Sequence, residues 1–448
     1  MLAEANLSVE TALGLARERY AAQNPNSRLA NEAAQAVMPG GNTRSVLHFD
    51  PFPLTMVKGV EAQLFDVDGH SYTDFVGEFS AGLFGHSNPV IKAAIREALD
   101  IGTVMASPTR LEVNLAEAVR ARFPSMELLR FCNSGTEANL MAIVTAMAFT
   151  GRRKLLVFRE AYHGGVLVFS GGGSALNVPF DYVLADYNDI EGTEAAIRAH
   201  AGSLAAVIVE PILGAGGNIP GKPAFLKMLR TACDEAGALL IFDEVKTSRC
   251  GAGGVQGALG ISPDMTTLGK YIGGGLPTGA FGGRRDVMDR YDHRQPNPLK
   301  HAGTFNNNVC TMMAGHAALT RVFTSTRAEE FAGSCEQFRT QLNDDMKKRG
   351  APVQFTGLGS LITVHFSSRP IESTKDIPAA SKKLGQLFHM ECALRSILVA
   401  SRGDIFISLA VTQAQLEHLR QTVIAFVEDY RSLIEREILL PSLADRAD

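Results

Sequence analysis

Short apolar runs alternate with helix-like segments from about residue 128 to residue 283. The runs show no polar alternation, which is typical of strands buried on both faces of a sheet. The pattern therefore predicts an α/β fold with a mostly parallel central sheet and helices on both faces. The expected strands are Leu129–Cys132, Lys154–Phe158, Tyr182–Ala185, Leu204–Glu210, Ala238–Asp243, Met265–Leu268 and Ala280–Gly282, and the expected helices are Thr136–Phe149, Ile190–His200 and Ala224–Ala236.

The two flanking regions have mixed patterns. On the N-terminal side we expect a helix that ends before Pro25, a hairpin turn at Asp68-Gly69 and a helix capped by Asn88. From about Glu329 onward, helices alternate with short strands and predict a smaller α+β unit. Its elements include strands Ser360–His365 and Ile405–Leu409 and a last helix over Gln413–Glu437. We therefore divide the chain into an N-terminal segment (1–85), a large domain (86–328) and a C-terminal small domain (329–448).

Composition narrows the class of protein. The 448 residues are 46% hydrophobic and 20% charged, as in ordinary globular proteins. Lys plus Arg is 43 against 47 for Asp plus Glu, a net charge of −4, so we expect no binding to nucleic acid or to an anionic membrane. No apolar stretch is long enough to span a membrane, and the acidic N-terminus does not resemble a secretory leader. The six cysteines have no metal-site or disulfide spacing, so we expect reduced thiols, no metal and a cytoplasmic location.

Two residues beside predicted strands point to one kind of chemistry. Asp243 ends an apolar strand, where the ligand crevice of a parallel sheet opens. A buried carboxylate there could hold a protonated pyridine nitrogen, although a helix-capping or loop aspartate is the simpler alternative. Lys270 lies between a strand and the glycines Gly273–Gly275. Burial would lower the pKa of its amine and let it form a Schiff base, whereas a lone lysine is more often solvated.

Two further segments would complete a cofactor site. The segment Asn133–Asn139 joins a strand to a helix, and its small residues would expose backbone N–H groups that bind phosphate. Ser134 as a plain helix cap is the alternative. Tyr162 and His163 follow another strand and would bring aromatic rings to the same sheet edge, unless they pack in the core. A phosphate cradle, a stacking ring, a strand-end acid and a lysine together favour pyridoxal 5′-phosphate (PLP) as cofactor.

The same residues resemble a known family. The chain is similar to the class III aminotransferases, fold-type I PLP enzymes, in the motifs Asn133–Asn139, Tyr162–Gly164, Glu210-Pro211, Phe242–Val245, Thr267–Lys270 and Gly303–Phe305. The resemblance runs over nearly the whole chain. Its branch holds glutamate-1-semialdehyde aminomutase and the β-amino acid aminotransferases, and segments Met38–Val46, Phe52–Leu54 and Gly303–Asn308 resemble the latter more closely.

The resemblance implies a role for each of these residues. Lys270 would be the catalytic Schiff-base lysine and would move the substrate proton. Asp243 would pair with the pyridinium nitrogen, with Glu210 behind it. The ring would lie between Val245 and Tyr162, with His163 beside it, and the phosphate would be held by Ser134, Gly135, Thr136 and, from the neighbouring subunit, Thr304. A homodimer with active sites at the subunit interface is therefore implied, to which the N-terminal segment would contribute.

Two arginines are the candidates for substrate binding. An arginine grips a carboxylate through two parallel hydrogen bonds. In this branch Arg44 would bind the carboxylate of a β-amino acid, and Arg402 would bind that of the keto acid and swing aside for an aromatic side chain. Surface salt bridges are the alternative for both arginines. Phe79 and Phe84 would form pocket walls or pack in the core.

One residue departs from the branch pattern. Lys246 follows the Asp243–Val245 motif where the branch usually has an uncharged residue, and it could change the charge preference of the pocket. We therefore predict an aminotransferase that moves the amino group of a β-phenylalanine-like donor to pyruvate or 2-oxoglutarate by a ping-pong mechanism. A glutamate-1-semialdehyde 2,1-aminomutase type of isomerase and an amine:pyruvate transaminase are the alternatives. A binding protein without activity would have lost Lys270 or Asp243.

Overall fold

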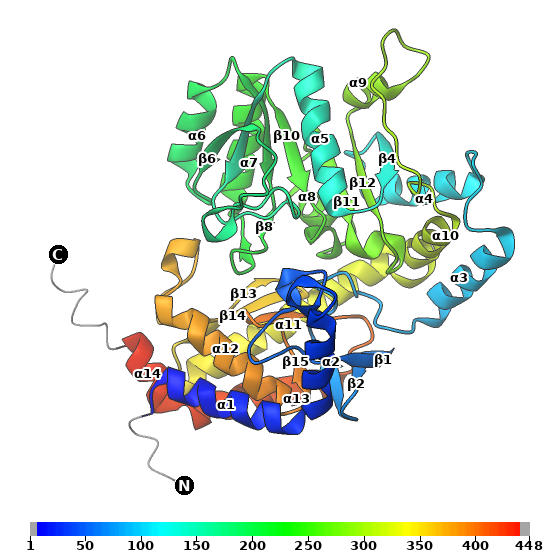
Figure 1. Ribbon diagram of the computed structural model, residues 1–448. Helices are drawn as coiled ribbons and strands as arrows, with labels where there is room; N and C mark the ends of the chain where they lie inside the picture. The colour runs from blue at the N-terminus through cyan, green and yellow to red at the C-terminus, as the bar shows by residue number, and fades with distance from the viewer. Residues whose placement is uncertain (1–6, 440–448) are drawn as a thin grey trace.

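The central element of the fold is a seven-stranded sheet with the strand order β4-β12-β11-β10-β7-β5-β6 (Figure 1). The computed structural model describes residues 7–439. All strands of this sheet are parallel except β12, which runs antiparallel to both of its neighbours. The strands are β4 (Leu128–Cys132), β5 (Lys154–Phe158), β6 (Asp181–Ala185), β7 (Leu204–Val209), β10 (Leu239–Asp243), β11 (Met265–Gly269) and β12 (Gly279–Gly283). The predicted α/β class with a mostly parallel sheet is confirmed.

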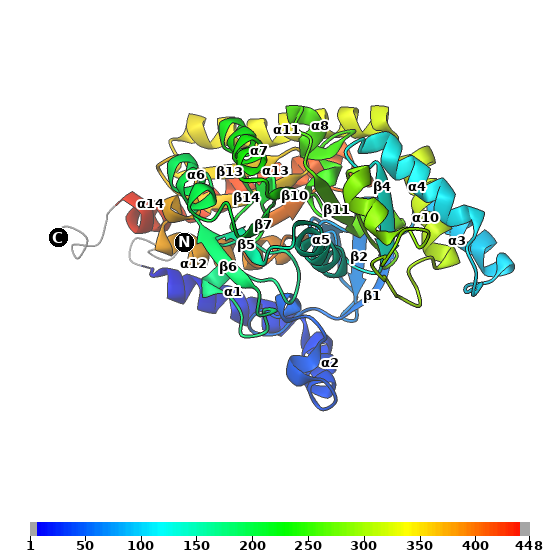
Figure 2. The same cartoon turned by 90° about the horizontal axis from the view of Figure 1, so that it is seen from above.

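Helices cover both faces of this sheet. Helix α5 (Gly135–Thr150) packs across β10, β11 and β12 on one face, and α7 (Pro223–Ala236) packs on β7 and β10 on the other (Figure 2). Central strands β7 and β10 are buried along their whole length, which explains their continuous apolar sequences. Shorter elements complete this layer: α6 (Ile190–Ala199), β8 (Ile212–Leu213), β9 (Ile219–Pro220), α8 (Gly254–Leu259) and α9 (Arg285–Met288).

The two ends of the chain build a second layer together. Strand β15 pairs in parallel with β3 in a four-stranded sheet, and helix α1 packs on α12. A three-stranded antiparallel sheet, β13-β14-β16, lies beside them. The strands are β1 (Met56–Val60), β2 (Gln63–Asp66), β3 (Ser71–Asp74), β13 (Val353–Leu358), β14 (Leu361–Phe366), β15 (Ile397–Leu398) and β16 (Asp404–Phe406). The helices of this layer are α1 (Val9–Gln23), α2 (Pro25–Gln35), α11 (Ser325–Arg349), α12 (Ala379–Ala393), α13 (Gln413–Asp429) and α14 (Arg431–Leu439).

Three helices extend the large sheet on one side. Helix α10 (Val309–Ala317) packs against both α3 (Pro89–Ile101) and α4 (Arg110–Arg122), and all three lie on the right of Figure 1. The side-chain oxygen of Asn88 accepts hydrogen bonds from the amides of Val90 and Ile91, so the predicted cap of α3 is confirmed. The proposed domain boundaries at 85/86 and 328/329 stay a prediction, and the outer ends, residues 1–6 and 440–448, lie outside the described residues.

Some elements differ from the sequence expectations. Pro25 ends α1 as expected, but it also begins α2, because proline fits the first turn of a helix. Strand β13 was not predicted, although Val353 to Thr356 alternate between apolar and polar residues; Gly357 interrupts this pattern. The expected last helix is divided at Tyr430 into α13 and α14.

Candidate active site

A cavity of about 610 Å³ opens at the carboxyl ends of the parallel strands. Its lining comes from strand ends β5, β7, β10 and β11, from the start of α5 and from loops of both ends of the chain. It brings together eleven predicted site residues: Arg44, Phe79, Gly135, Thr136, Tyr162, His163, Glu210, Asp243, Val245, Lys270 and Arg402. The volume is within the range of ligand-binding cavities.

Asp243 is a buried charged group of this cavity and is only 4% exposed. Its Oδ2 accepts hydrogen bonds of 2.8 Å each from Asn139 Nδ2 and from His163 Nδ1. Its Oδ1 accepts from the backbone amide of Val245 at 3.0 Å. Asn139 is itself held by the hydroxyl of Thr267, which donates to its Oδ1 at 2.6 Å. The carboxylate therefore has a fixed orientation and spare acceptor capacity for a cation.

Lys270 follows directly after β11 and has a backbone φ of 56°, in the left-handed region that side chains other than glycine rarely adopt. Non-glycine residues persist in this region mainly at functional sites, where the surrounding fold holds them. Burial lowers the pKa of its amine, although the charges of Asp243 and Glu210 oppose the shift. A lysine with a lowered pKa is a better nucleophile at neutral pH.

Glu210, at the end of β7, is a second buried carboxyl of the cavity. Its Oε1 accepts from the backbone amide of Tyr162 at 2.9 Å, and its Oε2 accepts from the amide of Gly214 at 3.1 Å. Burial raises its pKa, an effect that the nearby charge of Asp243 reinforces. Glu210 thus fixes the loop that carries Tyr162, whose half-exposed ring lines the cavity.

The N-terminus of α5 lines another side of the cavity through Gly135 and Thr136. A methyl group on Gly135 would lie 2.6 Å from Val245 Cγ1, and one on Gly164 would lie 2.3 Å from Thr136 Oγ1. These glycines allow the helix start, the loop after β5 and the segment after β10 to approach closely. Because the first amides of a helix lack helical partners, this wall can bind an anion such as phosphate.

Two arginines lie above the ring of Phe79 at the mouth of the cavity. The guanidinium carbons of Arg44 and Arg402 are 5.5 Å and 6.0 Å from the ring centroid. Arg44 also forms an exposed ion pair with Glu78. Glu78 and Phe79 belong to four consecutive residues, 77–80, whose φ values of 49°, 50°, 53° and 77° form a left-handed turn.

Arg402 is held in place through its Nε, which donates a hydrogen bond to the fully buried carboxylate of Asp404. Lys246 lies in the same wall. Its Nζ donates to Asn218 Oδ1 at 2.6 Å and lies 4.8 Å from the ring centroid of Phe406. Burial lowers the pKa of Lys246 to about 8.

Three predicted site residues lie outside the cavity lining. Phe84 is 5% exposed and packs edge-on against Tyr271 in the core, so the expectation that it forms a pocket wall is wrong for this chain. Ser134 is the N-cap of α5, with its hydroxyl accepting from the amide of Glu137 at 3.1 Å. Thr304 is exposed in the loop before α10, and its predicted role concerns a second subunit, so the single chain does not test it.

Sequence reasoning missed several residues that hold the site. Asn139 lies four residues after Gly135 on α5, so helical spacing alone could have assigned it to the same face. Asp404 and Asn218 carry no comparable signal. They meet only because distant parts of the chain pack together, with Asn218 Nδ2 donating to Asp404 Oδ1 at 3.3 Å.

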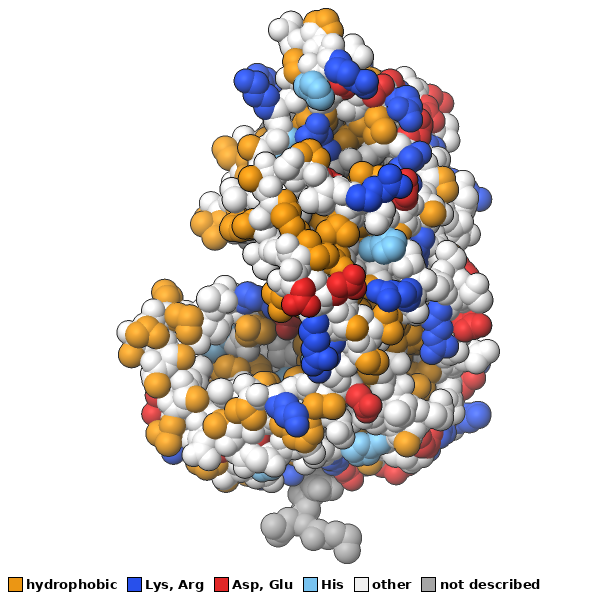
Figure 3. Space-filling view, turned by 90° about the vertical axis from the view of Figure 1, so that its right-hand side faces the viewer, with side chains coloured by type: hydrophobic (Ala, Val, Ile, Leu, Met, Phe, Trp, Pro, Cys, Tyr) orange, Lys and Arg blue, Asp and Glu red, His pale blue; other side chains and the backbone are white. Residues whose placement is uncertain are grey.

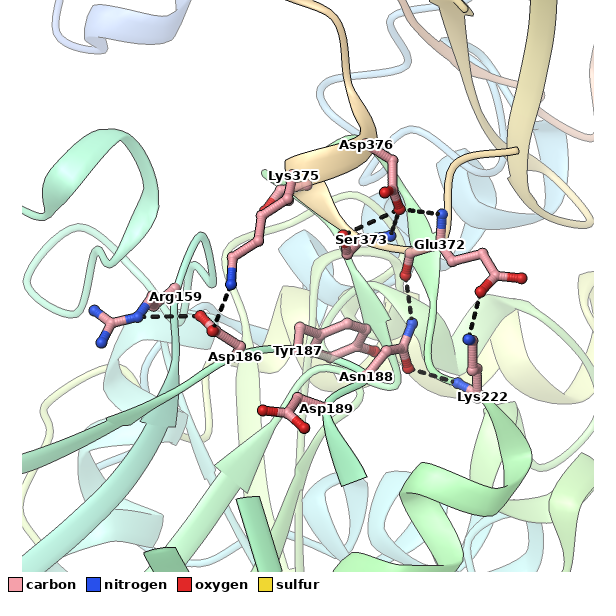
Figure 4. Close-up of a pocket in the computed structure, with 11 residues that line it drawn as sticks. Arg159, Asp186, Tyr187, Asn188, Asp189, Lys222, Glu372, Ser373, Lys375 and Asp376 are labelled. Carbon is pink, nitrogen blue, oxygen red and sulfur yellow. Dashed lines mark hydrogen bonds and ion pairs between the residues drawn. The ribbon is translucent and has the colours of Figure 1, made fainter. Parts of the chain in front are cut away.

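A second hollow, of about 290 Å³, is lined by charged groups that pair with one another (Figure 4). Lys375 Nζ and Arg159 Nε lie 2.7 Å and 3.1 Å from carboxylate oxygens of Asp186, and Lys222 reaches Glu372. Because Arg159, Lys222 and Lys375 are all paired with carboxylates that line the same hollow, the residues that line it include no unpaired cation. Within residues 7–439, no helix is long and apolar enough to cross a membrane.

Comparison with known proteins agrees with this site. The chain matches the family described as aminotransferase class-III over residues 47–421. It is 46% identical over 429 residues to the β-phenylalanine transaminase of Variovorax paradoxus, covering 96% of this chain and 99% of that protein. It is 37% identical over 420 residues to a glutamate-1-semialdehyde 2,1-aminomutase of Anaeromyxobacter sp., covering 88% of this chain and 96% of that protein.

Solved structures give the same result. The β-phenylalanine aminotransferase from Variovorax paradoxus superposes with a TM-score of 0.93 at 46% identity, over 95% of this chain and 99% of that one. A transaminase with PLP bound superposes with a TM-score of 0.84 at 31% identity, over 92% and 99% of the two chains. The chain belongs to the class III aminotransferases. It is a PLP-dependent enzyme of fold type I, so the predicted family, fold class and cofactor are confirmed.

Proposed function

We propose that the protein transfers the amino group of a β-phenylalanine-like β-amino acid to a 2-oxo acid, pyruvate or 2-oxoglutarate, by a ping-pong mechanism. The observation that carries this proposal is the pair Arg44 and Arg402, which flank the ring of Phe79 in the cavity that holds Lys270. Two guanidinium groups beside one aromatic ring suit substrates that combine a carboxylate with an aromatic group. The 46% identity to a β-phenylalanine transaminase supports the same substrate class.

The residues of the cavity fit PLP. Asp243, oriented by Asn139 and His163, would hold the pyridinium nitrogen, and the start of α5 at Gly135 and Thr136, with the cap Ser134, would hold the phosphate. Tyr162 and Val245 would contact the ring, with Glu210 positioning the Tyr162 loop. Bound there, PLP supplies an electron sink for the carbon that bears the amino group.

Lys270 would act both as nucleophile and as proton carrier. Its Nζ would hold the cofactor in the resting enzyme. Once a substrate amine has taken that place, the amine of Lys270, with its pKa lowered by burial, would accept the proton from the amine-bearing carbon of the substrate. The half-buried wall around it, including Tyr162 and Val245, limits the access of water to this proton.

The two arginines would bind different substrates. Arg44 would grip the carboxylate of the β-amino acid, which must displace Glu78, and this exposed ion pair is weak enough to be exchanged. Arg402 uses only Nε in its bond to Asp404, so its terminal nitrogens face no other partner in the described part of the chain. These nitrogens would bind the carboxylate of the keto acid, and the side chain would move aside for an aromatic group.

Replacing Arg44 with Gln tests this assignment. We expect kcat/KM for β-phenylalanine to fall roughly 30- to 150-fold, because a charge-assisted contact contributes about 2–3 kcal/mol. The rate with 1-phenylethylamine, which lacks the carboxylate, should change little. Glu78→Gln serves as a matched control that removes the competing anion and leaves Arg44 in place. An equal loss with both amines would remove Arg44 from substrate binding.

An amino shift of the glutamate-1-semialdehyde type is the second candidate, since relatives with that name are 37% identical to this chain. An aminomutase returns the amino group to the same molecule and needs no keto acid. Turnover of the semialdehyde without an added acceptor would favour it. An amine:pyruvate transaminase would act on amines without a carboxylate and would not depend on Arg44.

We also propose a homodimer that completes the active sites. Apolar side chains gather on the face seen in Figure 3, on the side of α3 and α10, and the surface there is hollowed. The exposed ones include Leu99, Ile101, Val104, Met105 and Phe305, at 38–62% exposure. Asn308 Nδ2 donates to the carbonyl oxygen of Thr103 at 3.3 Å, which brings the loop of Thr304 and Phe305 beside this patch.

We also propose a cytoplasmic location, which the six free cysteine thiols support.

A further inference from the structure

Asp404 lies behind Arg402 in the wall of the cavity and has no exposed surface. Its Oδ1 accepts from Thr363 Oγ1 at 2.6 Å and from Asn218 Nδ2 at 3.3 Å, and its Oδ2 accepts from Arg402 Nε. A buried carboxylate that loses its only cation is destabilised strongly, because no water replaces the lost partner. The position of Arg402 therefore depends on what else neutralises Asp404.

Lys246 is the second cation near Asp404. Its Nζ donates to Asn218 Oδ1 at 2.6 Å, while the amide nitrogen of the same Asn218 donates to Asp404. Although burial opposes the shift, the charges of Arg402 and Lys246 hold the pKa of Asp404 below its usual range. A chain of contacts thus joins Lys246, through Asn218 and Asp404, to Arg402.

The guanidinium group of Arg402 is bound to the protein through only one of its three nitrogens. Only Nε is bonded to protein, and 40% of its side chain is exposed to the cavity. Arg402 and Lys246 also repel each other, since the charge of Arg402 lowers the pKa of Lys246. Removal of Lys246 would relieve this repulsion and leave Asp404 dependent on Arg402 alone, which would bind Arg402 more tightly to Asp404.

We propose that Lys246 is a positioning residue that balances the buried carboxylate of Asp404 through Asn218, so that Arg402 can leave Asp404 when an uncharged donor side chain enters. The keto acid needs Arg402 in the position described here, whereas an aromatic donor needs it displaced. Lys246 therefore favours the donor half-reaction over the acceptor half-reaction. This inference rests on the proposed function, because it assumes both kinds of substrate.

The kinetic test compares half-reactions of the holoenzyme and two variants. Lys246→Gln keeps a hydrogen-bond donor on the side chain and removes the charge, and Lys246→Arg keeps the charge. We expect Lys246→Gln to lower kcat/KM for β-phenylalanine about tenfold, mainly through KM, and to change that for pyruvate less than about twofold. Lys246→Arg should restore most of the donor rate. Equal losses for donor and acceptor would overturn the proposal, as would a loss confined to 2-oxoglutarate, which would mean that Lys246 contacts a distal carboxylate directly.

A second test needs no substrate. Thermal unfolding of the holoenzyme is followed for Arg402→Gln, Lys246→Gln and the double variant. When Arg402→Gln is made alone, Lys246 still neutralises Asp404. When it is made together with Lys246→Gln, Asp404 has neither cation. The midpoint should therefore fall by several degrees more when Arg402→Gln is added to Lys246→Gln than when it is added to the wild type. Additive shifts would overturn the proposed balance. If the coupling is present and β-phenylalanine is not a substrate, the proposed function fails while the balance around Asp404 stands.

The exposed Lys222 provides the control for both tests. It pairs with Glu372 in the hollow of Figure 4, remote from Asp404 in its contacts. Lys222→Gln should show neither the selective loss of the donor half-reaction nor any coupling to Arg402→Gln. A similar response from Lys222→Gln would mean that general surface charge causes the effect, which would contradict the role given to Lys246.

Discussion

Several residues in and beside the proposed active site have a strained, left-handed backbone. Lys270 and the non-glycine residues Glu78, Phe79 and Ser80 all have left-handed φ values. The carbonyl oxygen of Ser80 accepts from Arg249 Nη1 at 2.7 Å, and Arg249 also donates to Ser360 Oγ at 2.9 Å. Arg249 is fully buried and holds the turn against the second layer of the fold. Contacts of this kind can maintain a backbone conformation that local sequence disfavours.

The role of a single residue could be predicted where the neighbouring sequence shows its position in the fold. Asp243 and Lys270 follow apolar strands, and strand ends of a parallel sheet meet at one edge. Phe84 was ambiguous because an apolar side chain in a loop can face either a cavity or the core. The partners Asp404 and Asn218 were not predictable, because their contact depends on the packing of segments that lie 186 residues apart.

His389 gives a prediction for stability against pH. Burial lowers the pKa of its imidazole to about 4, and its Nδ1 lies 2.8 Å from the carbonyl oxygen of Val399. The unfolded chain protonates this group near pH 6.5, so between about pH 4 and 6.5 the unfolded state binds more protons and stability falls as the pH falls. Lowering the pH to 4 should therefore reduce the free energy of unfolding by roughly 3 kcal/mol through this group.

The variant His389→Asn keeps a hydrogen-bond donor for Val399 and does not titrate. We expect its free energy of unfolding to be lower than that of the wild type at neutral pH, because a cavity forms. Between about pH 4 and 6.5 its dependence on pH should be flatter. Denaturant titrations across this range measure both slopes, and parallel slopes would show that His389 titrates normally in the folded protein.

At the scale of elements, the strands of the large sheet were predicted to within about two residues, because burial on both faces makes them continuously apolar. Helix α2 and strand β13 were missed. Proline at the start of α2 marks either a break or a first helical turn, and sequence alone does not distinguish these. Strand β13 contains Gly357, which weakens its local strand signal, and it pairs with β14 along its whole length.

The close approach of α5 to the loop after β5 can be tested by substitution. Gly164 has a φ of 121°, and a methyl group there would overlap Thr136 Oγ1. Gly164→Ala should push the two segments apart and weaken PLP binding by about tenfold or more, measured as the dissociation constant of PLP. Gly257→Ala is the matched control, since its methyl group would meet no atom within 4 Å in a helical position. Unchanged PLP affinity in Gly164→Ala would contradict this description of the phosphate wall.

At the scale of the whole molecule, the two ends of the chain meet in one layer. The parallel pairing of β15 with β3 joins residues that no local pattern could connect. The ion pairs of Figure 4 likewise link the loop after β6 and the start of α7 to the segment 372–376. Because these pairs are largely exposed, they contribute little to stability and mainly define how the segments meet.

The proposed homodimer is tested at the same scale. Val104 is 62% exposed in the patch near Thr304 and Phe305. Val104→Asp should place a charge in the interface and shift the protein from twice the chain mass to a monomer in light scattering, with loss of transaminase activity. Leu184→Asp, at an exposed apolar position on the edge strand β6, is the control and should remain a dimer. A wild-type enzyme that is active as a monomer would contradict the shared active site.

The central claim is that this class III aminotransferase takes its amino group from an aromatic β-amino acid. The most direct measurement is a single half-reaction, in which the PLP-loaded enzyme is mixed with β-phenylalanine without a keto acid and its absorbance spectrum is followed. We predict that the absorbance of the lysine-bound cofactor is replaced by that of the pyridoxamine form and that pyruvate or 2-oxoglutarate reverses the change. Lys270→Ala should show neither change. A wild-type spectrum that responds to glutamate-1-semialdehyde but not to β-phenylalanine would contradict the claim.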